Sequence, residues 1–447
     1  DSYNTAVGYA SGINVTTGIS NTLIGAQAGD TLTTGSYNIA IGYLALSSET
    51  EYGLNVAIGF KALFAQDAGA NAYNVAIGHA AGAAVTTGVD NTIVGGLAGD
   101  ALTTGTRNSL FGKDAGSALT TGVNNTAIGK SALASSVDGD SNTAIGYAAL
   151  EDYEDGDGNG HNTAVGAKSQ LNASTGEFNT SLGSLSMGVG VTTGNHNTAL
   201  GYKAGQDLTG GHSNALLGAF AGANITTGLQ NVAIGYGALN TANTGESKNV
   251  AVGTNALSLM DNPTDNFNTA VGYEAGKLMT TGIQNTLIGS LAGDALTSGS
   301  YNTVLGYGAL STEDAHGKNV AIGFKALVVQ NAGADGFNTA VGFEAGKNVT
   351  TAIKNTIIGG LAGDALTTGG QNVVMGYLAL STEDTGSKSI AIGTSALKTQ
   401  NYDGDAYNVA VGHDAGKLIT SGVQNTIIGG AAGDALTTGG FNVAVGY

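Results

Sequence analysis

The residues best suited to chemistry lie in an acidic stretch between positions 151 and 161. Asp155, Asp157 and Asn159 alternate with glycine there, and this matches the start of a D-x-[DN]-x-[DN]-G calcium loop. Gly166 stands where that loop carries its bidentate glutamate. The stretch is therefore either a calcium site or a solvated acidic loop, and calcium is the one cofactor that the sequence suggests.

Patterns typical of enzymes are missing from the sequence. The 6 histidines are scattered, without the paired spacing of metal ligands. The segment 129–131, Gly-Lys-Ser, lacks the earlier glycine and the following helix of a phosphate loop. We expect no catalytic residues and no enzymatic activity.

The charge balance restricts the partners. The chain has 447 residues, with 33 acidic and 15 basic side chains and a net charge of −18. This charge repels nucleic acid, and no apolar run is long enough to span a membrane. The chain has no cysteine, which suits a protein outside the cell. We predict an extracellular protein that binds no nucleic acid and does not insert this segment into a membrane.

The composition predicts a thin core rather than a thick one. There are 75 glycines and one proline, and hydrophobic residues make up 42% of the chain, most of them small. The recurring hydrophobic pattern argues against disorder. Because the chain begins and ends inside a repeat, we expect it to be part of a longer chain or filament.

One five-residue frame, first seen as NTAVG at 4–8, occurs 26 times at spacings of 17 to 20 residues. Its first residue is Asn in every copy except one, where it is Ser389, and its fifth is always Gly. An alanine follows three residues later in almost every copy. The first copies supply the candidate structural residues Asn4, Asn21, Asn38, Asn55, Asn74, Asn91, Gly8, Gly25, Gly42 and Gly59.

Seventeen residues are too few for a helix-pair repeat or a propeller blade. They suffice for two short strands and two turns, which is one coil of a β-solenoid. The sequence thus predicts an all-β, parallel β-solenoid of about 26 coils forming one continuous domain, 1–447. Equivalent residues would stack, so that asparagine carboxamides hydrogen-bond along the axis and glycines permit tight corners.

A longer period overlies the short one. The frame positions repeat every 70 residues from 268 to 338 to 408, and one coil in each period carries a two-residue insertion. These insertions lie at 67–73, 261–267, 331–337 and 401–407 and are rich in Asp, Asn and Gly. We expect them to protrude at intervals along one edge.

The strand positions are apolar or β-branched on both faces, and this predicts assembly. One face can line the coil interior, but the other would leave a long apolar stripe in water. The simplest cover is another copy of the chain, and closed symmetry favours a homotrimeric rod. The alternative is a wider monomeric β-helix in which a second sheet covers this face.

The repeat resembles known families. NVAIG at 55–59 and 319–323, followed by alanine, resembles the head repeats of YadA-like trimeric autotransporter adhesins. The fuller repeat, as in NVAIGYGAL at 231–239, is similar to the tail-fibre-domain repeats of bacteria and phages. The resemblance implies a left-handed parallel β-roll, a homotrimer and surface attachment. The coils here are longer, and their asparagine more regular, than in YadA-type repeats.

Three functions follow from these observations. The first is a structural shaft or head of an extracellular adhesin or phage tail fibre, on a cell or virion surface, that spaces and presents loops to a host-surface receptor or glycan. The second is a calcium-dependent module that binds a glycan or receptor. The third is a subunit of a self-polymerising extracellular filament.

Overall fold

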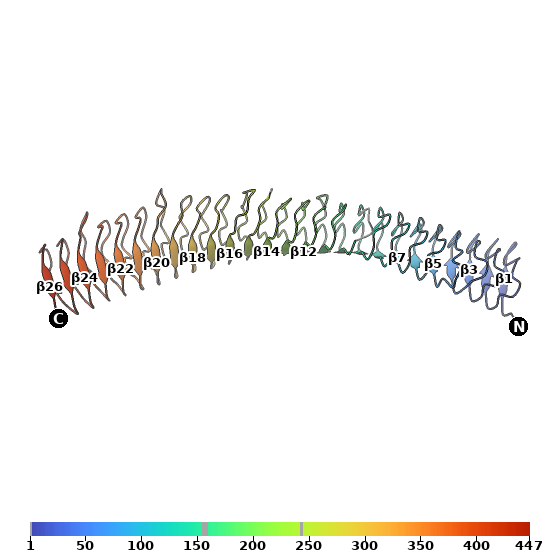
Figure 1. The fold of residues 1–447 in the computed structure, drawn as a ribbon, viewed down its shortest axis with the longest axis horizontal. Helices are drawn as coiled ribbons and strands as arrows, with labels where there is room; N and C mark the ends of the chain where they lie inside the picture. The colour runs from blue at the N-terminus through green and yellow to red at the C-terminus, as the bar shows by residue number, and fades with distance from the viewer. Residues whose placement is uncertain (1, 154–159, 242–244) are drawn as a thin grey trace. The chain divides into compact units, whose positions relative to one another are not determined.

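The computed structural model describes residues 2–153, 160–241 and 245–447. The chain divides into two compact units, Asp1–Thr227 and Gly228–Tyr447. Each unit is a stack of short coils, and each coil carries one three-residue strand (Figure 1). That 1–447 form a single continuous domain stays a prediction.

The strands recur at the frame positions in both units. Those of unit 1 are β1 (Thr5–Val7), β2 (Thr22–Ile24), β3 (Ile39–Ile41), β4 (Val56–Ile58), β5 (Val75–Ile77), β6 (Thr92–Val94), β7 (Ser109–Phe111), β8 (Thr126–Ile128), β9 (Thr143–Ile145), β10 (Thr163–Val165), β11 (Thr180–Leu182), β12 (Thr198–Leu200) and β13 (Ala215–Leu217). Those of unit 2 are β14 (Val232–Ile234), β15 (Val250–Val252), β16 (Thr269–Val271), β17 (Thr286–Ile288), β18 (Thr303–Leu305), β19 (Val320–Ile322), β20 (Thr339–Val341), β21 (Thr356–Ile358), β22 (Val373–Met375), β23 (Ile390–Ile392), β24 (Val409–Val411), β25 (Thr426–Ile428) and β26 (Val443–Val445).

Within each unit the strands pair in parallel with equivalent residues side by side. Ala57 of β4 lies opposite Ala76 of β5, and Ala251 of β15 lies opposite Ala270 of β16. Since the side chains of a strand alternate between its faces, this register keeps each column of residues on one face. The prediction of an all-β parallel β-solenoid is confirmed, and the described residues contain no helix, hence none that could cross a membrane.

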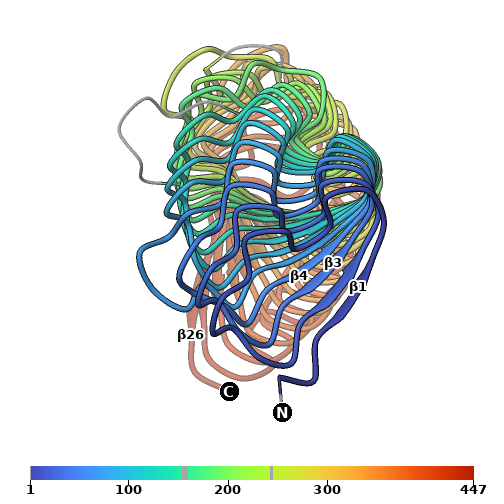
Figure 2. The same ribbon diagram turned by 90° about the vertical axis from the view of Figure 1, so that its right-hand side faces the viewer.

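The core is narrow and built from small side chains. In every strand from β2 to β25 the middle residue is buried and its two neighbours point outward, as in β4, where Ala57 is fully buried between Val56 and Ile58. Buried alanines after the turn and buried leucines, such as Ala62 and Leu63, fill the rest. Figure 2 looks at the N-terminal end of unit 1, where the strands lie on one side of the coils.

The prediction of two strands per coil is wrong, because the structure has one strand per coil in the part of the chain that it describes. The rest of each coil is made of turns that contain left-handed residues. Gln27 and Tyr37 have φ values of 57° and 61°, and equivalent residues recur in the following coils. Such residues cannot continue an extended strand. Their amides still pair between coils, as when Gln27 N donates to Tyr9 O at 2.8 Å.

The frame glycine allows the coils to approach one another. Gly42 has a φ of 137°, and a Cβ atom there would lie 2.3 Å from the carbonyl oxygen of Gly59 in the next coil. Gly8, Gly25 and Gly59 have the same backbone conformation, and each faces the carbonyl oxygen of the frame glycine in its own next coil. An L-amino acid with a side chain fits neither the angle nor the space.

Candidate functional site

The frame asparagines bind each coil to the next. Asn21 Nδ2 donates to the Gly35 carbonyl of its own coil at 2.9 Å, and Asn21 Oδ1 accepts from the main-chain N–H of Asn38 at 2.9 Å. The same Oδ1 contact links the pairs Asn4–Asn21, Asn38–Asn55, Asn55–Asn74 and Asn74–Asn91. The carboxamides thus bond mainly to the backbone, with direct contacts between carboxamides in some coils, such as Asn108 to Asn91 at 3.2 Å.

The one serine in the frame has a substitute partner. Ser389 N still donates to Asn372 Oδ1 at 2.9 Å, while Gln400 Nε2 donates to the Ser389 hydroxyl at 3.0 Å. Gln400 therefore fills part of the space and the bonding that an asparagine would provide. The sequence alone did not connect these two residues.

Buried glutamates organise the coils that carry the insertions, a role that the sequence reasoning missed. Glu383 is fully buried, and its carboxylate accepts from Gln400 Nε2 at 2.9 Å, Gly386 N at 2.7 Å and Tyr402 N at 3.1 Å. Gln400 Oε1 in turn accepts from Asn408 Nδ2 at 2.9 Å. A chain of buried polar groups therefore fixes the start of the insertion 401–407.

The same arrangement recurs at Glu313, but the carboxylate of Glu49 is less well paired. Glu49 Oε1 accepts from Tyr52 N at 3.2 Å, whereas Oε2 is buried and has no hydrogen-bond partner among the described residues. Burial raises the pKa of Glu49, against the effect of the Tyr52 N–H, and nearby Asp67 raises it further. Burial likewise raises the pKa of Glu313.

These groups predict that mild acid stabilises the protein. The folded-state pKa of Glu49 is above its ordinary value of 4.5, so the folded state holds the proton more tightly than the unfolded state. Its stabilising effect is complete below pH 4.5 and is lost as the pH rises through the folded-state pKa. We therefore expect the thermal unfolding temperature to decrease as the pH is raised from 4.5 to 7.

The variant Glu49→Gln removes the titration and the unpaired charge. It should raise the free energy of unfolding at pH 7 by roughly 1 kcal/mol and flatten the pH dependence. Thermal melts followed by circular dichroism measure both effects. The exposed neighbour Glu51→Gln is the control and should leave the pH dependence unchanged. An unaltered slope in Glu49→Gln would show that this carboxyl is not the source.

The predicted calcium residues Asp155, Asp157 and Asn159 lie outside the described residues. Asp140, in the preceding coil, uses its Oδ1 to accept from Val123 N at 2.7 Å. A second cluster that offers metal-ligand atoms lies in unit 2, where such atoms of Glu313, Asp314 and His316 are within 4.8 Å of one another. The carboxylate of Glu313 already accepts from Gln330 and from the main chain. Calcium binding stays a prediction.

An ion pair and an aromatic ring recur at the insertions of unit 2. Lys388 Nζ donates to Asp405 Oδ2 at 2.6 Å and to the Tyr407 hydroxyl at 3.2 Å, and it lies 5.2 Å from the centroid of the Tyr407 ring. The equivalent groups are Lys248, Asp265 and Phe267 in one insertion and Lys318, Asp335 and Phe337 in the next. The 70-residue period thus presents one chemical group repeatedly.

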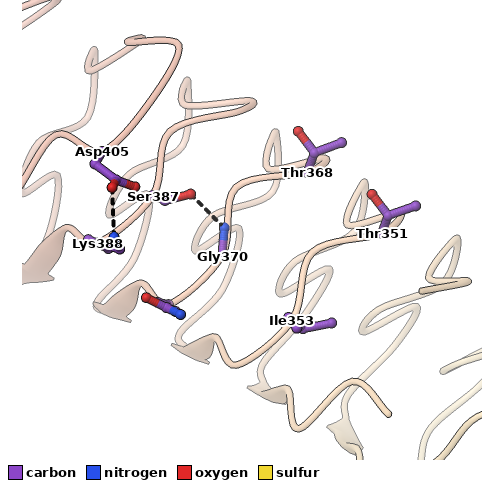
Figure 3. Close-up of a pocket in the computed structure, with 8 residues that line it drawn as sticks. Thr351, Ile353, Thr368, Gly370, Ser387, Lys388 and Asp405 are labelled. Carbon is purple, nitrogen blue, oxygen red and sulfur yellow. Dashed lines mark hydrogen bonds and ion pairs between the residues drawn. The ribbon is translucent and has the colours of Figure 1, made fainter. Parts of the chain in front are cut away.

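A polar pocket of about 250 Å³ lies beside the last of these groups (Figure 3). Thr351 and Thr368 lie on one side, and Ser387, Lys388 and Asp405 lie on the other. Ser387 Oγ accepts from Gly370 N at 3.1 Å and thereby links two adjacent coils that line the pocket. The pocket combines hydroxyl groups with a paired cation and anion.

The outward strand face carries a column of exposed apolar side chains in both units, next to a first-position column that is threonine in many strands. The third strand residue is exposed by 41% at Ile128 and by 52% at Leu182 in unit 1, and by 44% at Leu305 in unit 2. A second column follows the frame glycine and contains stacked rings, such as Tyr307, Phe324 and Phe343, with centroids 5.6 and 5.3 Å apart. Each unit therefore has an apolar face along its strands.

Comparisons with protein families and with curated proteins give no relative. No protein-family model matches the chain, and the curated proteins include no significant sequence match. The function is therefore argued from the repeat and from the geometry of the two surfaces described above.

Proposed function

We propose that the chain is a structural segment of an extracellular fibre, of the kind found in surface adhesins and phage tail fibres. Its coils supply a regular scaffold, and its insertions are presented at fixed intervals for attachment to a host surface. The exposed apolar strand face is the observation that carries this proposal, because long apolar surfaces of this kind usually mark a site where another protein packs.

The partner proposed for this face is the chain itself, as a homotrimer of left-handed coils. Neighbouring strands keep the same register, so that the apolar columns of one copy can pack along those of another over their length. The family resemblance favours three copies, and closed symmetry limits the assembly to a defined size. A location on a cell or virion surface follows from this proposed role.

Charges placed on the strand face should separate the copies. The triple variant Phe111→Glu, Ile128→Glu and Leu182→Glu puts three carboxylates among the exposed apolar side chains. We expect the unaltered chain to sediment at three times its mass of 43.9 kDa, and the variant to sediment as a single chain. Analytical ultracentrifugation measures the mass, and circular dichroism checks that the strands persist.

The control carries the same charges elsewhere. Thr87→Glu, Thr104→Glu and Thr121→Glu alter exposed residues in one turn column away from the strands, and this variant should keep the mass of the unaltered chain. A single-chain mass for the unaltered protein at micromolar concentration would refute the assembly. So would a strand-face variant that still assembles.

A further inference from the structure

The pocket of unit 2 has a counterpart in unit 1. A pocket of about 260 Å³ lies at the same positions of the repeat, again next to a coil with an insertion. The equivalent lining residues are Thr34 and Thr368, Gly53 and Ser387, and Asn71 and Asp405. Because the pocket recurs in two units with different sequences, we regard it as a property of the insertion-bearing coils.

The lining suits a neutral ligand with many hydroxyl groups. Thr351, Thr368 and Ser387 can each donate and accept a hydrogen bond. Asp405 accepts hydrogen bonds and Lys388 donates them. Because these two charged groups pair with each other at 2.6 Å, their charges largely cancel in the pocket. The pocket of unit 1 offers the hydroxyl groups of Thr34 and Ser36 and the amide of Asn71, and its carboxylate is that of Glu51, with no basic residue in the lining.

An exposed ring stands beside each pocket. Tyr407 is 48% exposed and follows Asp405 by two residues, and Tyr73 is 56% exposed and follows Asn71 by two residues. An aromatic face packs well against the apolar C–H face of a sugar ring, while the polar groups next to it bind the hydroxyls. Rings in the same position, Phe267 and Phe337, accompany the other two ion pairs of unit 2.

Charged ligands suit the pocket less well. An anion meets a lysine already paired with Asp405 and a chain with a net charge of −18. A metal ion meets one carboxylate in the pocket of unit 2, and that carboxylate is bound to Lys388. Neutral saccharides remain the ligand class that fits the pocket and the ring together.

We propose that the corner pockets bind neutral saccharide units, with the ring of Tyr407 or Tyr73 stacking on the sugar. This names the ligand for the attachment role proposed above, and it rests on that role. In unit 2 the ion-pair groups recur every 70 residues, or four coils, which corresponds to about 19 Å at 4.8 Å per coil. A linear polysaccharide can contact several of them at once and gain affinity through multivalency.

Native gels that contain soluble polysaccharides test the proposal. The probes are dextran, galactomannan and a linear β-1,3-glucan, with polygalacturonate as the anionic arm. We expect at least one neutral polymer to retard the full chain. The double variant Thr34→Trp/Thr368→Trp fills both pockets and should raise the dissociation constant, measured from the gel retardation, at least tenfold. The double variant Tyr73→Ala/Tyr407→Ala should raise it by a similar factor.

The control Thr17→Trp/Thr104→Trp places the same side chain in the turn column of Thr34 and Thr368, at exposed positions where neither of the next two coils carries an insertion, and should bind as the unaltered chain does. Retardation by none of the neutral polymers, or by polygalacturonate alone, would overturn the proposal. So would unchanged retardation in both pocket variants. Sedimentation in the same buffer reports the assembly separately, so failure of saccharide binding is distinguishable from failure of the fibre role.

Discussion

Replacing Gly112 with alanine is expected to lower the free energy of unfolding by at least about 3 kcal/mol. Gly112 has a φ of 138°, and a Cβ atom there would lie 2.4 Å from the carbonyl oxygen of Gly129 in the next coil. The new methyl group meets main chain on a rigid corner rather than a flexible side chain. The coils must therefore separate locally or the backbone must change conformation.

Urea and thermal unfolding followed by circular dichroism measure this loss. The matched control is Gly96→Ala, one coil earlier, where no heavy atom lies within 4 Å of the added Cβ and φ is outside the left-handed region. We expect this control to match the unaltered protein or to be slightly more stable, because alanine restricts the unfolded chain. If the two variants had equal stability, close stacking of the frame glycines would be refuted.

Replacing Asn355 with alanine should cost about 3–5 kcal/mol of unfolding free energy. Asn355 is buried; its Nδ2 donates to Gly369 O at 3.0 Å, and its Oδ1 accepts from Asn372 N at 2.9 Å. Alanine lacks the carboxamide, so the Gly369 carbonyl and the Asn372 N–H both lose this hydrogen bond in the narrow core. Leaving two buried polar groups without partners lowers the free energy of unfolding by more than the loss of two solvent-exposed hydrogen bonds would.

The exposed Asn348, in the preceding coil, provides the control. Asn348→Ala should change the unfolding free energy by less than about 0.5 kcal/mol. Equilibrium unfolding in urea compares the two variants in the same buffer. An Asn355→Ala protein as stable as Asn348→Ala would mean that the column of asparagines contributes little to the stack.

The sequence predicted the strands and their register because one frame carries both. In the frame at 55–59 the buried Ala57 alternates with outward Val56 and Ile58, so the pattern gives the strand and its inner face together. Repetition then places each frame next to the following one. A parallel solenoid with a narrow core was therefore accessible from the pattern alone.

The turns and the pockets were not accessible in this way. Left-handed conformation at Leu44 or Lys61 has no signature in residue type, since such residues ordinarily avoid it. The contact of Glu383 with Gln400 joins residues of neighbouring coils and becomes visible only when the coils are stacked. The pocket beside Asp405 likewise depends on four successive coils, and a five-residue frame does not contain that information.

The pairing of equivalent residues between adjacent coils has a genetic consequence. Each coil meets its neighbours through the same contacts, so a 70-residue block ends with the surface with which it began. Unequal recombination between blocks can therefore lengthen or shorten the gene product without creating a mismatched junction. Variation in length among related genes should then occur in steps of whole blocks.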